Sequence, residues 1–274
     1  MQVKMAEWNK TLKNKKFVLF ILFIFVLLLN TIIFGKINME NIMKVYAISD
    51  LHLSINSNKP MNIFGPVWDN YLEDIKADWA KKVKKNDVVL IPGDLSWAMK
   101  LDDAVLDLKY ISEMGVGTKI IIRGNHDYWW SAIGKVRSVL NDDMIALQND
   151  SVKIGNFVFC GSRGWTVPEF KHKTENDEKI FNRELNRVEL SLKNAVSKME
   201  KKDKLIVLIH YPPFNSKLED SAFTQLFEKY GVHKVVYGHL HSYDKKQKLV
   251  VTKNKIKYYL TSCDMVKNVL TKIC

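Results

Sequence analysis

Two apolar patterns alternate along the chain from residue 43 onward. Short, continuous runs rich in valine and isoleucine are typical of strands that are buried on both faces. Five such runs are Val45–Ile48, Val88–Ile91, Lys119–Ile122, Leu205–Ile209 and Lys234–Tyr237. Longer segments place apolar residues three or four positions apart, which predicts helices. These segments are Trp68–Trp79, Leu101–Ile111 and Glu175–Glu200.

A second set of short apolar runs is separated by residues that favour tight turns. The runs are Met144–Leu147, Val152–Ile154, Phe157–Cys160, Leu249–Thr252 and Lys257–Thr261. The turn residues are Asn149-Asp150, Gly155-Asn156 and Asn254, which are typical of β-hairpins. The sequence therefore predicts an α/β sandwich over residues 43–274, with two β-rich layers and the helices outside.

A different pattern precedes this domain. Residues 1–16 are basic, and residues 17–35 hold an uncharged stretch, Phe17 to Phe34, in which only Asn30 and Thr31 are polar. As a helix this stretch would measure about 27 Å, against a hydrocarbon core of roughly 30 Å. Lysines on its N-terminal side and the lack of a small-residue cleavage motif favour an uncleaved membrane anchor.

Two other interpretations of the first 42 residues stay open. The stretch could be a cleaved signal peptide, or the start site could be assigned too early, since Met39 and Met43 both precede the first predicted strand. The protein is expected to be membrane-associated through one N-terminal helix if the first start site is used, and cytoplasmic otherwise.

Composition narrows the function classes. Of the 274 residues, 47% are hydrophobic and 26% are charged, which excludes a disordered or low-complexity chain. Three scattered cysteines exclude a disulfide framework and a cysteine zinc site, so any metal must be held by other side chains. The net charge of +12 is carried largely by lysines on predicted helices, which indicates a solvated surface and no specific nucleic-acid partner.

Polar side chains follow five predicted strands at the point where each strand ends. Those of metal-ligating type are Asp50, His52, Asp94, Asn125, His210, His239 and His241. Molecules and ions that bind to open α/β sheets do so beyond the carboxyl ends of the strands. These side chains can therefore converge there without being neighbours in sequence. One such residue alone is more often a helix cap, a turn former or a core group, but seven together predict a metal centre. Oxygen and imidazole ligands without thiolate suit Mn²⁺, and also Fe or Zn²⁺, better than Ca²⁺.

The spacing within these motifs has a physical basis. Residues i and i+2 of an extended chain point to the same side, so Asp50 and His52 can face one site together. The same holds for His239 and His241. Glycines at 93, 124 and 238 would let the backbone turn sharply and approach the site closely.

The order of the motifs resembles that of the calcineurin-like metallophosphoesterase superfamily, over about residues 44–262. The motifs are D-x-H at 50–52, G-D at 93–94, G-N-H-D at 124–127, a single histidine at 210 and G-H-x-H at 238–241. The resemblance implies a four-layer αββα sandwich with two divalent metal ions. It implies that one metal is held by Asp50, His52, Asp94 and His241. It implies that the other is held by Asp94, Asn125, His210 and His239, with Asp94 shared.

The same resemblance implies a reaction. A hydroxide bridging the two metals would attack a phosphomonoester or a phosphodiester, so the expected partner is a phosphate-ester substrate. His126 would contact the phosphate and protonate the leaving group, and Asp127 would either orient His126 or stabilise the turn. Trp97-Ala98 stand where protein Ser/Thr phosphatases carry Asp-Arg, which argues against that branch.

The groups that would recognise the rest of the substrate are left open by the sequence. Arg163, one of five arginines, is either a phosphate-binding fork or half of a structural ion pair. Residues 59–68 are either a lid or a packed loop. Two alternative functions are a lipid-linked pyrophosphate hydrolase at the membrane and a non-catalytic scaffold that retains the fold, although the complete ligand set speaks against the scaffold. A third is nucleic-acid processing, which the pI of about 9.4 suggests, although nuclease relatives usually carry an extra DNA-binding module that this length does not provide.

Overall fold

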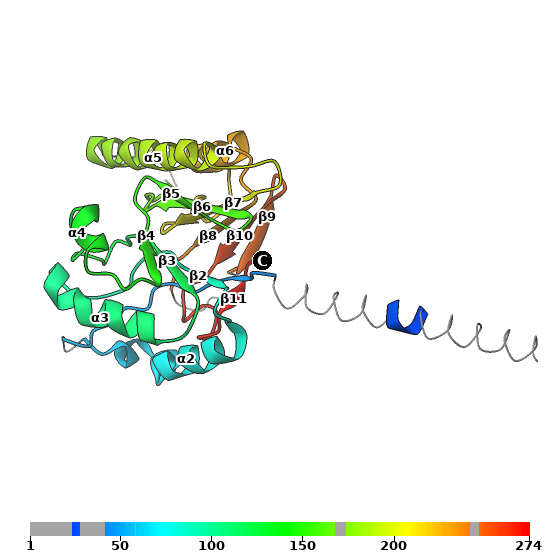
Figure 1. Ribbon diagram of the computed structural model, residues 1–274. Helices are drawn as coiled ribbons and strands as arrows, with labels where there is room; N and C mark the ends of the chain where they lie inside the picture. Colours follow the sequence, from blue (N-terminus) through cyan, green and yellow to red (C-terminus); the bar gives the residue numbers. More distant parts are fainter. Residues whose placement is uncertain (1–23, 28–41, 58, 168–173, 242–246) are drawn as a thin grey trace, which may run out of the picture. The chain divides into compact units, whose positions relative to one another are not determined.

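The computed structural model describes residues 24–27, 42–57, 59–167, 174–241 and 247–274 (Figure 1). The chain divides into two units, Met1–Ile42 and Met43–Cys274. Only residues 24–27 of the predicted membrane anchor are described, as a helical turn, so the prediction of an anchor at 17–35 lies outside the described residues. Across the described ranges, no helix has the length and apolar character that are needed to cross a bilayer.

Four parallel strands and one short antiparallel strand form the first sheet. Its order is β11 (Thr271–Lys272), β1 (Val45–Ala47), β2 (Val88–Ile91), β3 (Thr118–Ile121) and β4 (Met144–Ala146). Strands β1 to β4 run parallel, and β11 pairs antiparallel with β1. The sequence analysis does not predict β11, because two residues, Thr and Lys, carry no apolar pattern.

The position of β4 corrects a sequence-based grouping. The sequence analysis groups the run Met144–Leu147 with the hairpin strands because turn residues follow it. In the structure this run forms β4, which lies at the edge of the first sheet, parallel to β3. A short helix, α4 (Ile133–Arg137), lies in the connection between β3 and β4. The turn at Asn149-Asp150 leads from the first sheet into the second, because a turn signal does not specify which strands it joins.

The second sheet has six strands. Its order is β5 (Ser151–Ile154), β6 (Phe157–Ser162), β7 (Lys204–Ile209), β8 (Lys234–Tyr237), β10 (Ile256–Leu260) and β9 (Val250–Lys253). The four inner strands run parallel, and the two edge strands pair antiparallel with their sequence neighbours. The hairpins predicted at Gly155-Asn156 and Asn254 are confirmed, and both Gly155 and Asn254 take the positive φ that such turns require.

Helices cover the outer faces of both sheets. The longer ones are α2 (Tyr71–Lys82), α3 (Leu101–Glu113), α5 (Glu175–Val196) and α6 (Ala222–Lys229), and the short 3₁₀ turns are η1 (Met61–Phe64) and η2 (Pro66–Trp68). Helix α2 begins at Tyr71, so Trp68 of the predicted stripe lies in the preceding turn. Helix α6 was not predicted, although Ser221 opens it with a capping box.

Three buried clusters separate four layers. Trp79 of α2 lies in the cluster between the first sheet and its helices, and Leu192 of α5 lies in the cluster between the second sheet and its helices. Leu90 and Leu208 meet in the third cluster, between the two sheets. Figure 1 shows α5 and α6 along one side of the sheets and α2 and α3 along the other. The layers are helices, sheet, sheet and helices, as the sequence analysis predicted.

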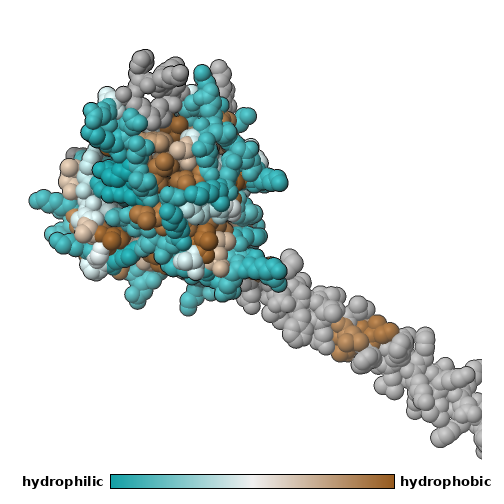
Figure 2. Space-filling view, turned by 90° about the horizontal axis from the view of Figure 1, so that it is seen from above, coloured by the Kyte–Doolittle hydropathy of each residue, from teal (hydrophilic) through white to brown (hydrophobic). Residues whose placement is uncertain are grey.

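The solvent-facing side of the helical layer that contains α5 is mainly polar (Figure 2). Figure 2 shows the side that carries α5, where hydrophilic side chains predominate and hydrophobic ones show only in patches between them. The inner strands are apolar along their length because neighbouring residues of a strand point to opposite layers, and both layers are apolar. The carboxyl ends of the parallel strands are therefore left as the place where polar side chains gather.

Candidate metal centre

Five loops at the carboxyl ends of β1, β2, β3, β7 and β8 bring the predicted ligands together. Three of these loops come from the first sheet and two from the second. Asp50, His52 and His241 offer ligand atoms that all lie within 4.8 Å of one another. Asp50, Asp94 and His210 do so as well, so Asp50 belongs to both groups.

Further short contacts lie within the first group and attach Asn125 and His239 to the second. His52 Nε2 lies 3.3 Å from His241 Nε2, and His241 Nε2 lies 3.5 Å from Asp50 Oδ1. Asn125 Oδ1 lies 2.7 Å from His210 Nε2 and 2.8 Å from His239 Nδ1. All seven residues singled out in the sequence thus stand in one continuous cluster.

Asp94 lies at the middle of this cluster. Its Oδ1 accepts a hydrogen bond from the His126 backbone N–H at 2.8 Å. Its Oδ2 is buried and has no hydrogen-bond partner among the described residues. That oxygen lies 3.5 Å from His210 Nε2 and 3.7 Å from His52 Nε2, so it reaches toward both groups.

The donors and acceptors around His210 leave room for a cation. The Pro92 carbonyl accepts a hydrogen bond from Nδ1 at 2.9 Å, which fixes the proton on that nitrogen when the ring is neutral. The lone pair of Nε2 then faces Asn125 Oδ1 and Asp94 Oδ2, both of which are acceptors. Three such acceptor atoms repel one another unless one of them takes up a proton or a cation lies between them, so the residues fit a divalent metal ion.

Burial and neighbouring charge shift the pKa values of these groups. Burial lowers the pKa of His52 to about 3 and that of His210 to about 4, so both rings are neutral at pH 7. Burial, with the nearby Asp50 and Asp127 carboxylates, raises the pKa of Asp94 to about 9. Two carboxylates this close cannot both stay ionised without a positive partner, and a metal ion would provide it.

The backbone of the site is unusual. Asp50, His52, Asp94 and His239 all take positive φ values, of 59°, 47°, 52° and 72°. The premise that these residues lie on extended chain is therefore wrong, although each pair does face one site. Non-glycine residues in this left-handed region cost about 1–3 kcal/mol each, and such strain is concentrated at functional sites.

Two glycines are required by close packing against the ligands. A Cβ atom at Gly124 would collide with Oδ1 and the backbone nitrogen of Asp94. A Cβ atom at Gly238 would collide with Oδ2 of Asp50. The close backbone approach predicted for these positions is confirmed.

A comparison with known protein families agrees with this geometry. The family model of the calcineurin-like phosphoesterases matches residues 43–243. The chain belongs to this family. No curated protein matches the chain.

Several solved structures share part of the shape of this metallophosphoesterase. Protein AQ665 of unknown function from Aquifex aeolicus is 12% identical, with 84% of this chain and 96% of that chain covered and a TM-score of 0.45. TT1561 of Thermus thermophilus is 12% identical, with 85% and 98% covered and a TM-score of 0.49. Purple acid phosphatase PPD1 from yellow lupin (Lupinus luteus) seeds is 18% identical, with 80% and 43% covered and a TM-score of 0.44.

One residue that orients a ligand was missed by the sequence analysis. Asp264 Oδ1 lies 3.0 Å from His241 Nδ1, and this contact and Asp50 outweigh burial and raise the pKa of His241 to about 10. A carboxylate on the far nitrogen of a ligand histidine fixes the ring and its tautomer. Asp264 follows the predicted strand Lys257–Thr261, which is the same relation to a strand that the predicted ligands have and could have revealed it.

His126 lies beside the candidate metal centre, between aromatic rings. Its ring centroid is 4.5 Å from that of Trp97 and 5.5 Å from that of His52. Its Nδ1 is buried without a hydrogen-bond partner among the described residues, and burial lowers the pKa of the ring. The neutral form therefore predominates at pH 7.

The carboxylate of Asp127 accepts hydrogen bonds from the backbone of two ligand loops. Its Oδ2 accepts from the N–H groups of Asp94 and Gly124, at 2.9 and 2.7 Å. Its Oδ1 accepts from the N–H groups of Leu95 and Ser96 and from Nε1 of Trp129, at 2.8, 3.1 and 3.0 Å. None of these contacts involves the His126 ring.

The aromatic residues near the motifs divide into two groups. Trp97 stacks on His52 with ring centroids 4.7 Å apart, and Tyr211 lies 4.3 Å from His239. Trp129 and Trp130 are almost fully buried and belong to the core of the first sheet and its helices. Core packing thus accounts for the second pair, whereas the first pair supports ligand rings.

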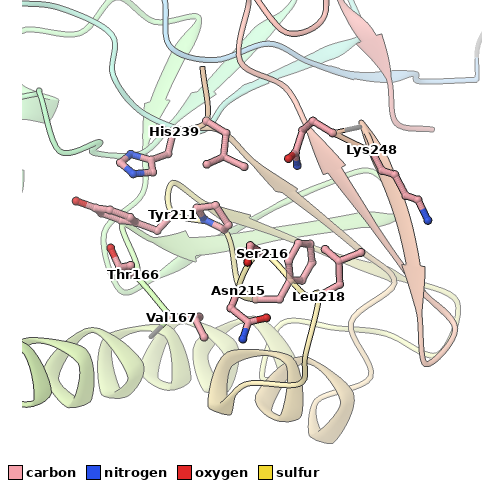
Figure 3. A pocket seen from close by; sticks show the side chains of 12 residues that line it. Thr166, Val167, Tyr211, Asn215, Ser216, Leu218, His239 and Lys248 are labelled. Carbon is pink, nitrogen blue, oxygen red and sulfur yellow. The ribbon is translucent and has the colours of Figure 1, made fainter. Parts of the chain in front are cut away.

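Two cavities border the metal centre. One, of about 540 Å³, is lined by His52, His126 and His241 on one side and by apolar residues of 61–68 with Trp97 on the other. The other, of about 310 Å³, has His239 and Tyr211 at one end and Asn215, Leu218 and Lys248 farther along (Figure 3). Residues 59–68 therefore form a wall beside the site.

Arg163 does not reach this centre with its side chain. Its guanidinium lies 3.4 Å from Oε1 of the buried Glu184 and 4.9 Å from the ring centroid of Trp165. Its backbone carbonyl accepts hydrogen bonds from the N–H groups of His210 and Tyr211. Arg163 lines a separate, small polar cavity.

Proposed function

We propose that the domain Met43–Cys274 hydrolyses a phosphomonoester or a phosphodiester with the aid of two divalent metal ions, Mn²⁺ being the best match to the ligand set. The observation that carries the proposal is the convergence of ligand atoms from His210, Asn125 and Asp94, where Oδ2 of Asp94 has no hydrogen-bond partner among the described residues. Divalent cations bound there would supply an activated nucleophile and positive charge opposite the phosphoryl oxygens.

The assignment of ligands follows the resemblance to the family and differs from the two structural groups, in which Asp50 and not Asp94 occurs twice. Asp50, His52, Asp94 and His241 would hold one cation, and Asp94, Asn125, His210 and His239 would hold the other. The unpartnered Oδ2 of Asp94 supports its sharing between the two, since it lies within 3.7 Å of a histidine nitrogen from each set. Asp264 and the Pro92 carbonyl would keep His241 and His210 turned toward the cations.

His126 is proposed to contact the phosphoryl group. Its ring borders the 540 Å³ cavity next to His52 and His241, so it stands where a leaving group would depart. A neutral ring donates one hydrogen bond, and the negative charge of a bound phosphate would raise its pKa and favour proton donation. Asp127 is proposed to act on the reaction only by holding the loops of Asp94 and Gly124 together.

The pair of cavities favours a substrate with groups on both sides of the phosphorus. A monoester has one substituent on phosphorus and a diester or pyrophosphate has two. The cavity beside His126 is walled by Phe64, Pro66, Val67 and Trp97, so it suits an apolar substituent. The cavity beside His239 is lined in part by Asn215 and Lys248, so it suits a polar or anionic one.

A lipid-linked pyrophosphate is the second candidate substrate. The apolar cavity next to His126 and the uncharged stretch predicted as an anchor at 17–35 both favour it. A non-catalytic scaffold would need neither the acceptor cluster nor the two cavities.

The test is a screen of mono-, di- and pyrophosphate esters with the chain from Met43 onward, supplemented with Mn²⁺. We expect bis-p-nitrophenyl phosphate to be cleaved faster than p-nitrophenyl phosphate, and Phe64→Ala to reduce this preference without removing metal. No metal-dependent cleavage of any ester would leave the scaffold as the function. Cleavage of pyrophosphates alone would favour the second candidate.

A further inference from the structure

Four of the five arginines of the chain gather around a single carboxylate, Glu184, which is not one of the candidate metal ligands. Arg137 has its own partner, Asp150. The guanidiniums of Arg163, Arg183 and Arg187 all lie near one oxygen, Oε1 of Glu184, at 3.4, 3.3 and 2.7 Å. Glu184 is fully buried, and its Oε2 has no hydrogen-bond partner among the described residues.

The fourth arginine, Arg123, approaches Glu184 from the end of another strand. Arg123 follows β3 and lines one small cavity with Arg163, Glu184 and Arg187. The atom Nε of Arg123 is buried and lacks a partner among the described residues. Of the residues that line this cavity, Glu184 is the only acidic one, so three positive side chains face one negative charge.

One carboxylate oxygen cannot satisfy three planar forks. Charge-assisted hydrogen bonds between guanidinium and carboxylate measure about 2.7–2.9 Å, and a carboxylate pairs best with one fork through both of its oxygens. Only Arg187 reaches that distance here. The remaining N–H donors and the excess positive charge of these partly buried arginines favour a further anion, because a half-buried charge without a full partner is costly.

The remaining walls of the cavity also carry hydrogen-bonding groups. Ser131, Gln148, Asn149 and Ser162 line it. Gln148 accepts from Nε1 of Trp130 through its carbonyl oxygen, at 2.8 Å, so its amide NH₂ is left to donate. The volume of about 90 Å³ admits a compact group and excludes a nucleoside or a lipid.

We infer that this cavity, lined by Arg123, Arg163 and Arg187, binds a phosphate group at a site separate from the metal centre. A phosphate presents several oxygens to several forks and carries enough negative charge to balance the excess. The phosphate comes either as free orthophosphate or as the terminal group of a phosphomonoester. The site does not depend on hydrolysis at the metal centre.

The site is tied to the ligand loops through the main chain. The Arg163 carbonyl accepts the N–H of the ligand His210 at 3.0 Å, and Arg123 is followed by Gly124 and the ligand Asn125. The arginine cavity and the ligand loops therefore share backbone segments.

The test is calorimetric titration of orthophosphate into the full chain in the presence of EDTA, which prevents binding through metal ions. We expect one site, and we expect Arg187→Gln to weaken binding at least tenfold. Arg183→Gln is the matched control, because Arg183 contacts the same oxygen of Glu184 but does not line the cavity. We expect it to change the affinity less than twofold.

A second variant keeps the test valid if Arg187→Gln does not fold. Ser131 is exposed and lines the cavity, so Ser131→Asp adds a negative charge there with little effect on packing, and Ser131→Asn is its neutral control. We expect the aspartate variant alone to abolish binding.

Three results would overturn the inference. They are no binding of phosphate in EDTA, equal losses in Arg183→Gln and Arg187→Gln, and unchanged binding in Ser131→Asp. A parallel titration with phenyl phosphate separates the two sources. Binding of orthophosphate alone identifies free phosphate as the ligand, and binding of both identifies a terminal phosphate group.

Discussion

Asp127→Asn tests whether this buried carboxylate holds the metal loops or serves His126. The replacement has almost the same shape, but one acceptor oxygen becomes an NH₂ group. The fewest hydrogen bonds are lost when the NH₂ group takes the place of Oδ2. Two of the five are then lost, because the N–H groups of Asp94 and Gly124 face another donor.

The magnitude follows from these two contacts. Hydrogen bonds to a charged group contribute about 1.5–3 kcal/mol each, so the gross loss is about 3–6 kcal/mol. Burial opposes this, because it raises the pKa of Asp127 to about 6 and an amide escapes the cost of burying a charge. The net loss is therefore smaller than the gross one, and we expect unfolding to become easier by about 1–3 kcal/mol, which lowers Tm by roughly 2–12 °C for a domain of this size.

The assay is urea unfolding of the metal-free chain, followed by tryptophan fluorescence, with Asp142→Asn as the control at an exposed position. The control is expected to shift the free energy of unfolding by less than about 0.5 kcal/mol. If Asp127→Asn destabilised the domain by under about 1 kcal/mol, below the lower bound for the two lost hydrogen bonds, yet lost most of its turnover, the loop-holding role would be refuted. Asp127 would then orient the His126 ring.

Four further outcomes are expected. Asp94→Asn should abolish nearly all cleavage of bis-p-nitrophenyl phosphate and reduce the metal content measured by mass spectrometry, and substantial turnover would contradict the shared-ligand assignment. His126→Ala should keep its metal but lose about 10²–10⁴-fold in turnover, and loss of metal would mean that the ring is structural. Metal binding at pH 7 should release protons and strengthen as pH rises, because the pKa values of Asp94 and His241, raised to about 9 and about 10, leave both protonated in the metal-free protein. Calorimetry in buffers of different ionisation enthalpy measures this release, and proton uptake would refute it. The full chain expressed from Met1 should sediment with membranes and resist carbonate washing, whereas recovery in the soluble fraction would argue against an anchor at 17–35.

Local pattern was sufficient for every strand except β11 and for the side chains at the strand ends. An apolar run such as Leu205–Ile209 has to be buried on both faces, and a polar residue directly after it has to emerge at the edge of the sheet. This is why Asp50, Asn125 and His239 could be predicted to converge from distant parts of the chain. The glycines at 124 and 238 were predictable for the same reason, since only a residue without Cβ fits beside a ligand.

Contacts between elements could not be read in this way. The sheet to which Met144–Ala146 belongs depends on a neighbouring strand, and an isolated run does not encode its partner. Three contacts of this kind join segments far apart in sequence. Asp264 meets His241, Asp127 accepts from the N–H groups of residues 94–96, and Arg163 approaches Glu184.

The sequence by itself determined which residue types stand where strands end, because hydrophobic periodicity is a local property of the chain. Only the tertiary structure decided the left-handed conformation of Asp50, His52, Asp94 and His239 and the convergence of acceptor atoms around His210. Backbone strain of that kind is stabilised by the surrounding packing, and packing arises when both sheets come together.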